Sequence, residues 1–351
     1  MSLNLRRLTP LAAIAALALP LAACGSDDSS SGASTSGKAS SDGGSVTLYN
    51  AQHEDLMKLM TAQFTKETGI TVKMRNGDDL EMANQIVQEG DASPADVFAT
   101  ENSPGMTLVD RAGRFAKLDD ATLAQVPAQY SPTNGNWTGF AARSTVFVYN
   151  TTKLKRGDLP KSLLDLADPK WKGRFGYSPT GADFQAIVSA VLALKGEAAT
   201  KAWLAGLKAN AEPFDGNSTV MKAVSDGKVE GGVIYHYYWY QDQAEAGDNS
   251  KDTKLHFFGN QDPGAFTSVS GAGVLKSSKN QANAQKLVRF LSSRSGQRVL
   301  ADSSALEYTL ADGVAANKAL PPLTSLDAPK VDVTNLNSQK VIELMQDAGI
   351  L

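Results

Sequence analysis

An unusual run of aromatic residues occupies positions 235–240. Its sequence is Tyr235-His236-Tyr237-Tyr238-Trp239-Tyr240, in a chain of which only 7% is Phe, Trp or Tyr. Neighbouring residues of a strand point to opposite faces, so Tyr237 and Tyr238 fit poorly into a strand core. Where a strand passes into a helix, both phenols can converge on one point outside the sheet. Two other uses stay open, a mixed core and interface cluster or a platform on which a sugar ring stacks.

Polar residues also follow three other predicted strands. His53 and Glu101 each come directly after an apolar run, and the turn 180–183 opens a helix. The free N–H groups and the dipole of a helix N-terminus make that turn a candidate anion site. Each feature has an ordinary alternative. A single histidine is more often structural than a ligand, an acid at this place is commonly a helix N-terminal charge, and such a turn is commonly an N-cap.

The composition limits the chemistry that these residues can perform. The chain has 351 residues, 34 Lys and Arg, 37 Asp and Glu, one Cys and three His, with a net charge of −3. This charge provides no basic field and argues against a nucleic-acid partner. One Cys excludes a disulfide framework, a Cys-rich zinc site and a cysteine-ligated iron–sulfur cluster. A metal site in this chain would therefore depend on oxygen ligands.

The N-terminus predicts export and a lipid anchor. Residues 1–23 combine Arg6 and Arg7 with the apolar stretch 11–19, which is too short to span a bilayer. The run 21–24, Leu-Ala-Ala-Cys, resembles the bacterial lipobox, in which Cys24 is lipidated and becomes the mature N-terminus. The alternative is an ordinary cleaved signal. Residues 24–45 are rich in Ser and Gly and predict a flexible tether, so we expect a protein held at the outer face of the cytoplasmic membrane by its lipid alone.

The rest of the chain alternates between strand and helix patterns. Strands are predicted at 46–49, 70–74, 95–99, 144–149, 174–177, 232–235 and 271–275, and helices at 54–68, 79–89, from 183, through 241–246 and at 280–291. In the first helix, Leu56, Leu59, Met60 and Phe64 are expected on one face. This succession predicts mostly parallel sheets covered on both faces, in two α/β lobes. Ligands of such sheets bind at the carboxyl ends of the strands.

Taken together, these segments resemble the periplasmic ferric-ion-binding proteins, the substrate-binding components of iron ABC transporters. The resemblance rests mainly on 49–53 (Tyr-Asn-Ala-Gln-His), 94–101 (Pro-Ala-Asp-Val-Phe-Ala-Thr-Glu) and 237–240 (Tyr-Tyr-Trp-Tyr). It extends to 168–173, 261–265 and 275–280 and covers nearly all of 46–351. It implies a two-lobed clamshell with two β-crossings, near 142–145 and 267–270. The implied lobes are 46–143 with 269–316, and 144–268 with 317–351.

The resemblance also implies a ligand set. Fe(III) would be bound by His53, Glu101, Tyr237 and Tyr238, together with a synergistic anion such as phosphate or carbonate. The implied anion cradle consists of Thr180, Gly181, Ala182 and Asp183, with Asn217 donating to the anion and Arg143 near the cleft. The chain departs from the family pattern at 235–236, where Tyr-His replaces Asn-Asn, and at the anion turn, where Thr-Gly-Ala-Asp replaces Ser-Gly-Ala. The implied partners are an ABC permease and its ATPase, and the implied protein is a monomer without enzymatic activity.

The chemistry of ferric ion agrees with this ligand set. Fe(III) is a small, hard cation that prefers phenolate and carboxylate oxygens to sulfur. Two phenolates and one carboxylate together carry three negative charges, which equals the charge of the ion. A free tyrosine has a pKa near 10, so the metal itself must displace the phenolic protons at neutral pH. Binding should therefore weaken as the pH falls.

Two other classes of function stay open. The chain could bind a different small solute, such as a phosphonate, a polyamine, thiamine or a sugar, although those relatives lack a tyrosine pair with an upstream His and Glu. It could also be an exported enzyme in which His53 and Glu101 form an acid–base pair. No G-x-S-x-G or H-E-x-x-H motif is present, and no nucleophile is apparent.

Overall fold

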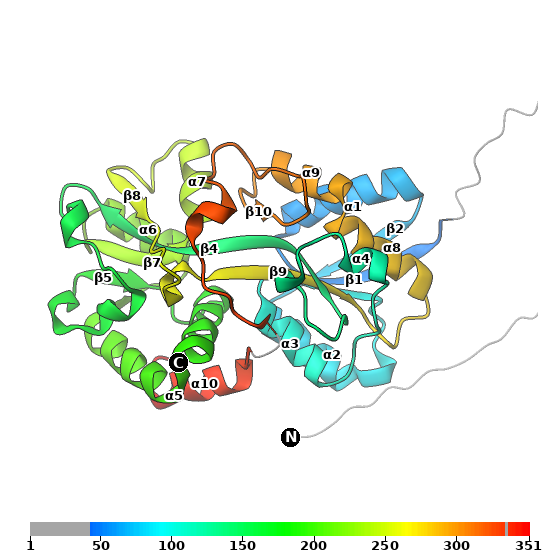
Figure 1. The fold of residues 1–351 in the computed structure, drawn as a ribbon, viewed down its shortest axis with the longest axis horizontal. Helices are drawn as coiled ribbons and strands as arrows, with labels where there is room; N and C mark the ends of the chain where they lie inside the picture. Colours follow the sequence, from blue (N-terminus) through cyan, green and yellow to red (C-terminus); the bar gives the residue numbers. More distant parts are fainter. Residues whose placement is uncertain (1–42, 334–335) are drawn as a thin grey trace, which may run out of the picture. The chain divides into compact units, whose positions relative to one another are not determined.

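The computed structural model describes residues 43–333 and 336–351, which fold as an α/β protein (Figure 1). The predicted signal peptide, Cys24 and all but the end of the predicted tether lie outside these residues. The strands are β1 Ser45–Ala51, β2 Thr71–Asn76, β3 Val97–Thr100, β4 Thr138–Asn150, β5 Phe175–Tyr177, β6 Glu212–Pro213, β7 Gly231–Tyr235, β8 Thr253–His256, β9 Thr267–Val274 and β10 Tyr308–Thr309. The α-helices are α1 Glu54–Thr68, α2 Asp79–Glu89, α3 Ser103–Arg111, α4 Asp120–Leu123, α5 Ala182–Asn210, α6 Asn217–Ser225, α7 His236–Ala244, α8 Gln281–Ser292, α9 Arg294–Asp302 and α10 Ser338–Asp347.

The strands form a mixed sheet with parallel ends and an antiparallel middle. Hydrogen-bonded neighbours follow the order β2-β1-β3-β9-β4-β7-β5-β6, and both β8 and β10 pair with β4. Strand β1 is parallel to β2 and β3, and β5 is parallel to β6 and β7. The ladders of β9 with β3 and of β4 with its neighbours are antiparallel. This mixed α/β architecture agrees with the predicted fold class. The sheet is not mostly parallel as expected, however, because β4 and β9 run against their neighbours and make five of the nine strand pairings among the described residues antiparallel.

Strand β4 connects the two ends of the sheet. Its residues up to Ser144 pair with β9, whereas Thr145 to Tyr149 pair with β7. The change of partner falls inside the predicted crossing at 142–145, and the β9 residues opposite it begin at Thr267. Figure 1 shows β4 and β9 running side by side through the centre, with helices grouped at both of their ends.

The first strands and helices follow the sequence prediction closely. Helix α1 has the predicted limits and ends at Gly69, whose φ of 73° is the left-handed conformation that glycine adopts without strain. One of the four residues predicted on one face of α1 is not buried. Leu56, Met60 and Phe64 are buried, whereas Leu59 is 51% exposed. At 100° per residue, Leu59 projects roughly 60° beyond Leu56, on the side away from the core.

Separate hydrophobic clusters stabilise the two ends of the sheet. One cluster packs α1, α8 and α9 against β1 and β3. Another packs α5 and α10 against β5 and β7 and includes Tyr235 and Tyr237. Burial of apolar surface on this scale holds the ends of β3 and β7 in place, and these strand ends carry the polar residues of interest.

No helix within the described part of the chain is both long enough and apolar enough to cross a membrane.

Candidate functional site

The candidate residues lie where strands end and helices begin. His53 follows β1 and is the N-cap of α1, and Glu101 follows β3. Tyr237 and Tyr238 lie in the first turn of α7, directly after β7. Asp183 lies in the first turn of α5, which follows β5 and a short turn. The structure thus brings together residues that are up to 185 positions apart in the sequence.

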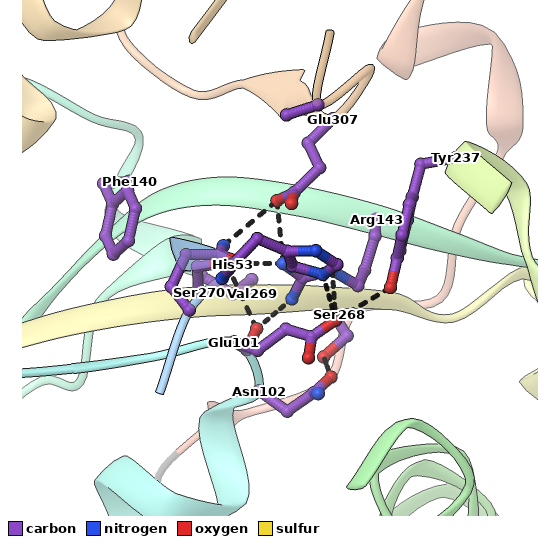
Figure 2. A network of polar contacts seen from close by, with 12 residues as sticks. His53, Glu101, Asn102, Phe140, Arg143, Tyr237, Ser268, Val269, Ser270 and Glu307 are labelled. Atoms are coloured by element: carbon purple, nitrogen blue, oxygen red, sulfur yellow. Dashed lines mark hydrogen bonds and ion pairs between the residues drawn. The ribbon is translucent and has the colours of Figure 1, made fainter. Parts of the chain in front are cut away.

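Glu101 is the centre of the site (Figure 2). Its Oε1 atom lies 3.0 Å from Nε2 of His53 and accepts a 2.9 Å hydrogen bond from the Tyr237 hydroxyl. The His53 and Tyr237 rings meet edge to face, with centroids 5.2 Å apart. One carboxylate oxygen is therefore shared by an imidazole and a phenol that come from opposite ends of the sheet.

The second phenol faces a second carboxylate. The Tyr238 ring stacks on the Tyr237 ring with centroids 4.2 Å apart, and its hydroxyl lies 3.5 Å from Oδ2 of Asp183. Asn217 donates a 2.7 Å hydrogen bond to the same oxygen, and Asn102 donates a 3.1 Å hydrogen bond to Oδ1. Asp183 is buried. The amide of Asn217, which the sequence prediction directs at an exogenous anion, here binds a carboxylate of the chain itself.

The other residues of the predicted anion cradle lie beside Asp183. Gly181 is the N-cap of α5, Ala182 is the first helical residue, and Thr180 is exposed. Arg143 does not approach this turn through any hydrogen bond within the described residues. It is fully buried and donates to the Glu101 carbonyl oxygen, to Ser270 and to a third carboxylate, Glu307.

The charges around Glu101 favour its ionised form. Burial alone would raise the pKa of Glu101, but the positive charge of Arg143 and the hydrogen bond to His53 outweigh it and lower this pKa to about 2. Burial opposes protonation of His53, whereas the hydrogen bond and charge of Glu101, with a further contribution from Glu307, raise the pKa of His53 to about 9. Without a metal, Glu101 and His53 thus form an ion pair near neutral pH.

The remaining oxygen donors are held in their protonated forms. Burial, reinforced by the charge of Glu101, raises the pKa of Asp183 to about 8. Burial also raises the pKa of Tyr237 and of Tyr238, and the neighbouring charges of Asp183 and Glu101 add to the effect. A cation that binds here must displace these protons.

Sequence reasoning missed several residues that support the site. The buried carboxylate of Asp79 accepts the backbone N–H groups of Glu101 and Asn102 at 2.8 and 2.9 Å. Gln52 accepts the backbone N–H of His53. Gln52 and Asn102 are sequence neighbours of predicted ligands, which could have identified them. Nothing in the sequence around Glu307 indicates that it lies at the site.

The donor set determines what the site can bind. Within the described residues, no three His, Cys, Asp or Glu side chains gather as a metal site by themselves. A metal ion here would therefore require the two phenols, and the set then becomes two phenolic oxygens, the carboxylates of Glu101 and Asp183, and one imidazole. Such a set suits a hard trivalent cation far better than zinc or copper(I).

Comparisons with known proteins also point to ferric ion. The profile of the family described as bacterial extracellular solute-binding protein matches residues 92–332. The Fe(3+)-binding periplasmic protein of Serratia marcescens is 60% identical over 313 residues, which are 89% of this chain and 92% of that protein. The chain belongs to the periplasmic ferric-ion-binding proteins. The resemblance stated from the sequence is thereby confirmed.

Solved structures of two proteins with bound iron share the fold. Iron-bound HitA from Pseudomonas aeruginosa matches with a TM-score of 0.82 and 45% identity, covering 87% of this chain and 99% of that one. The Trichodesmium IdiA (FutA) structure in complex with iron and citrate matches with a TM-score of 0.77 and 26% identity over 88% and 100% of the two chains. The two-lobed clamshell is confirmed, and as an extracellular solute-binding protein the chain works outside the cytoplasm.

Proposed function

We propose that this chain captures ferric ion between its two lobes, with His53, Glu101, Tyr237 and Tyr238 as ligands. The observation that carries the proposal is the position of Glu101 Oε1, 3.0 Å from an imidazole nitrogen and 2.9 Å from a phenol. A metal ion that replaced the protons at this point would contact all three groups. The names of the Serratia and Pseudomonas relatives support iron as the cargo.

We further propose that Asp183 supplies a carboxylate ligand and takes the place of the synergistic anion. Its Oδ2 atom already receives the amide of Asn217 and lies 3.5 Å from the Tyr238 hydroxyl. Once Asp183 is ionised as a metal ligand, a phosphate or carbonate ion in the same turn would meet its carboxylate, and the two negative charges would repel each other. An exogenous anion remains the second candidate, favoured by the iron and citrate bound together in the Trichodesmium structure.

Delivery to a transporter follows from the family. The chain would hand its ion to an ABC permease that is driven by an ATPase, and would act as a monomer tethered through lipidated Cys24, without enzymatic activity. We propose the lobe limits 46–143 with 269–316, and 144–268 with 317–351. The packing of α10 against α5 supports the C-terminal assignment, whereas Val333 packs with the cluster that contains Met82 and Phe98.

The direct test of the proposal is colour. Purified protein mixed with ferric citrate should develop a visible tyrosinate-to-iron charge-transfer band, which Tyr237→Phe and Tyr238→Phe should each weaken or shift. Tyr149→Phe is a suitable control, since this tyrosine belongs to β4 and lies away from the site. Colourless wild-type protein, or tyrosine variants with the wild-type spectrum, would refute the ligand assignment.

A second arm of the same test separates Asp183 from an exogenous anion. Wild-type protein should bind iron equally well with and without phosphate or carbonate. Asp183→Asn should lose affinity by about 10–100-fold or more in anion-free buffer and regain part of it when phosphate is added. Strict dependence of the wild-type protein on an added anion would instead support the anion cradle.

A further inference from the structure

Glu307 is a buried acid that contacts two residues beside the site, Gln52 and Arg143, and forms no hydrogen bond with the four proposed ligands among the described residues. It lies between α9 and β10 and is 1% exposed. Its Oε2 atom accepts hydrogen bonds from Nη2 of Arg143 at 2.7 Å and from Nε2 of Gln52 at 3.2 Å. Burying an ionised carboxylate is costly unless it is paired, so this placement calls for a reason.

Two series of contacts run from Glu307 to the two proposed ligands of the first lobe. In the first series, Gln52 binds Glu307 and Ser270 through its Nε2 and accepts a 2.6 Å hydrogen bond from the backbone N–H of His53 with its Oε1. In the second series, Arg143 binds Glu307 and donates a hydrogen bond to the backbone carbonyl of Glu101 (Figure 2). Glu307 is thus one contact away from the segments that carry both ligands.

Arg143 lies between two carboxylates that compete for it. Its Nη2 is 2.7 Å from Glu307, whereas its Nε is 3.7 Å from Oε1 of Glu101, the oxygen that His53 and Tyr237 also approach. Within the described residues, this Nε atom has no hydrogen bond. If Glu307 lost its charge, Glu101 would be the nearest counter-charge for a fully buried guanidinium, and a buried charge seeks a partner.

We propose that Glu307 is a positioning residue for ferric-ion binding. It neutralises Arg143 and holds it back from Glu101, so that the Glu101 carboxylate stays available to the metal, and through Gln52 it fixes the backbone from which His53 projects. This inference rests on the proposed function of the site. It adds a residue that acts on iron retention without touching the ion.

The test compares iron release from wild-type protein and Glu307→Gln. The variant keeps the shape of the side chain and removes its charge, so Arg143 should move onto Glu101. Transfer of iron to a competing chelator should become about 10–100-fold faster, while the charge-transfer band of the two tyrosinates keeps its position. Glu307→Asp keeps the charge and should give an intermediate rate, which also provides a result if Glu307→Gln folds poorly.

Glu230→Gln is the matched control, because Glu230 forms a 2.7 Å ion pair with Arg174 outside the site and its loss should leave iron release unchanged. A readout without iron separates this inference from the proposed function. In iron-free Glu307→Gln, the Nε–H of Arg143 should gain a hydrogen bond to Glu101, seen by NMR as slower hydrogen exchange. The inference would be overturned if both Glu307 variants released iron at the wild-type rate and showed unchanged hydrogen exchange at Arg143. If the wild-type protein bound no iron, only the proposed function would be overturned.

Discussion

The tyrosine pair is held in its neutral form until a cation arrives. Tyr237 is fully buried and hydrogen-bonded to an ionised Glu101, and both factors disfavour the phenolate. His53 and Asp183 also carry protons near neutral pH, because the pKa of His53 is raised to about 9 and that of Asp183 to about 8. Without a metal, the protons on these side chains provide the positive charge that a bound metal ion would otherwise supply.

The protons on these proposed ligands predict a steep pH dependence of iron binding. Below about pH 8, iron binding must displace protons from four side chains, those of Tyr237, Tyr238, His53 and Asp183. Each displaced proton lowers the affinity roughly tenfold for every unit by which the pH falls. Because every one of these pKa values lies above 7, affinity should fall by about a thousand- to ten-thousandfold between pH 7 and pH 6. Competition with a chelator, corrected for the chelator's own protonation, measures this slope. A slope near zero would show that the phenols are not ligands.

Single residues also show how far sequence reasoning reaches at the site. The proximity of His53, Glu101 and the tyrosine pair could be predicted, because each follows a strand and the family resemblance implies that they share one site. Their role as ligands stays a prediction. The carboxylate of Asp183 could be assigned to the correct turn but not to its contacts, since these depend on Asn102, 81 residues away, and on Asn217. Glu307 could not be predicted, because its role depends on the chain folding back beside Arg143, which is 164 residues away in the sequence.

At the scale of elements, the short strand β7 positions the tyrosine pair. It begins with Gly231 and Gly232, which let neighbouring elements approach closely. A Cβ atom added at Gly232 would lie 2.4 Å from Cγ1 of Val220 on α6, the helix whose first residue is Asn217. Val220 is buried and stiff at χ1, so it cannot move aside without shifting α6.

Gly232→Ala should therefore destabilise the protein by about 1–3 kcal/mol, the usual cost of overpacking a core. The shift of α6 should also move Asn217 away from Asp183 and weaken iron retention. Gly157→Ala is the control, because a Cβ atom there meets nothing within 4 Å and the cost should stay within about 0.5 kcal/mol. Urea unfolding of the iron-free proteins measures both values. Equal stability of the two variants would contradict the packing argument.

The limits of helices and strands could be predicted where they depend on residues that are close together in the sequence. The limits of α1 and α2 follow from caps and periodicity, whereas β4 extends six residues before the predicted strand start at 144. That extension leads into the crossing at 142–145. Its strand conformation depends on pairing with β9, which lies more than 120 residues later in the sequence. A single-strand pattern contains no information about such a partner.

At the scale of the whole molecule, the proposed ligands come from both sides of the crossing strands. His53 and Glu101 follow β1 and β3, whereas the tyrosines and Asp183 follow β7 and β5. The hydrogen bonds Tyr237–Glu101 and Asn102–Asp183 already connect the two sides in this structure. An ion that binds both sides would add its own bonds to these contacts and stabilise the closed state.

Small-angle scattering tests this clamshell behaviour. Iron-free protein should sample open conformations, and iron should reduce both the radius of gyration and the maximum dimension. Tyr237→Phe/Tyr238→Phe should keep the iron-free dimensions when iron is added, because the second lobe then lacks its phenolate ligands. Identical scattering of wild-type protein with and without iron would remove the support for closure around the ion.

The central claim is that one ferric ion is bound by the phenols of Tyr237 and Tyr238, the carboxylate of Glu101 and the imidazole of His53. Anomalous diffraction at the iron edge, from crystals of the iron-loaded protein, tests it most directly. We predict a single strong anomalous peak within bonding distance of both phenolic oxygens, a Glu101 oxygen and the Nε2 atom of His53, with an Asp183 oxygen also in contact. A peak elsewhere in the molecule, or one that contacts neither tyrosine, would contradict the account.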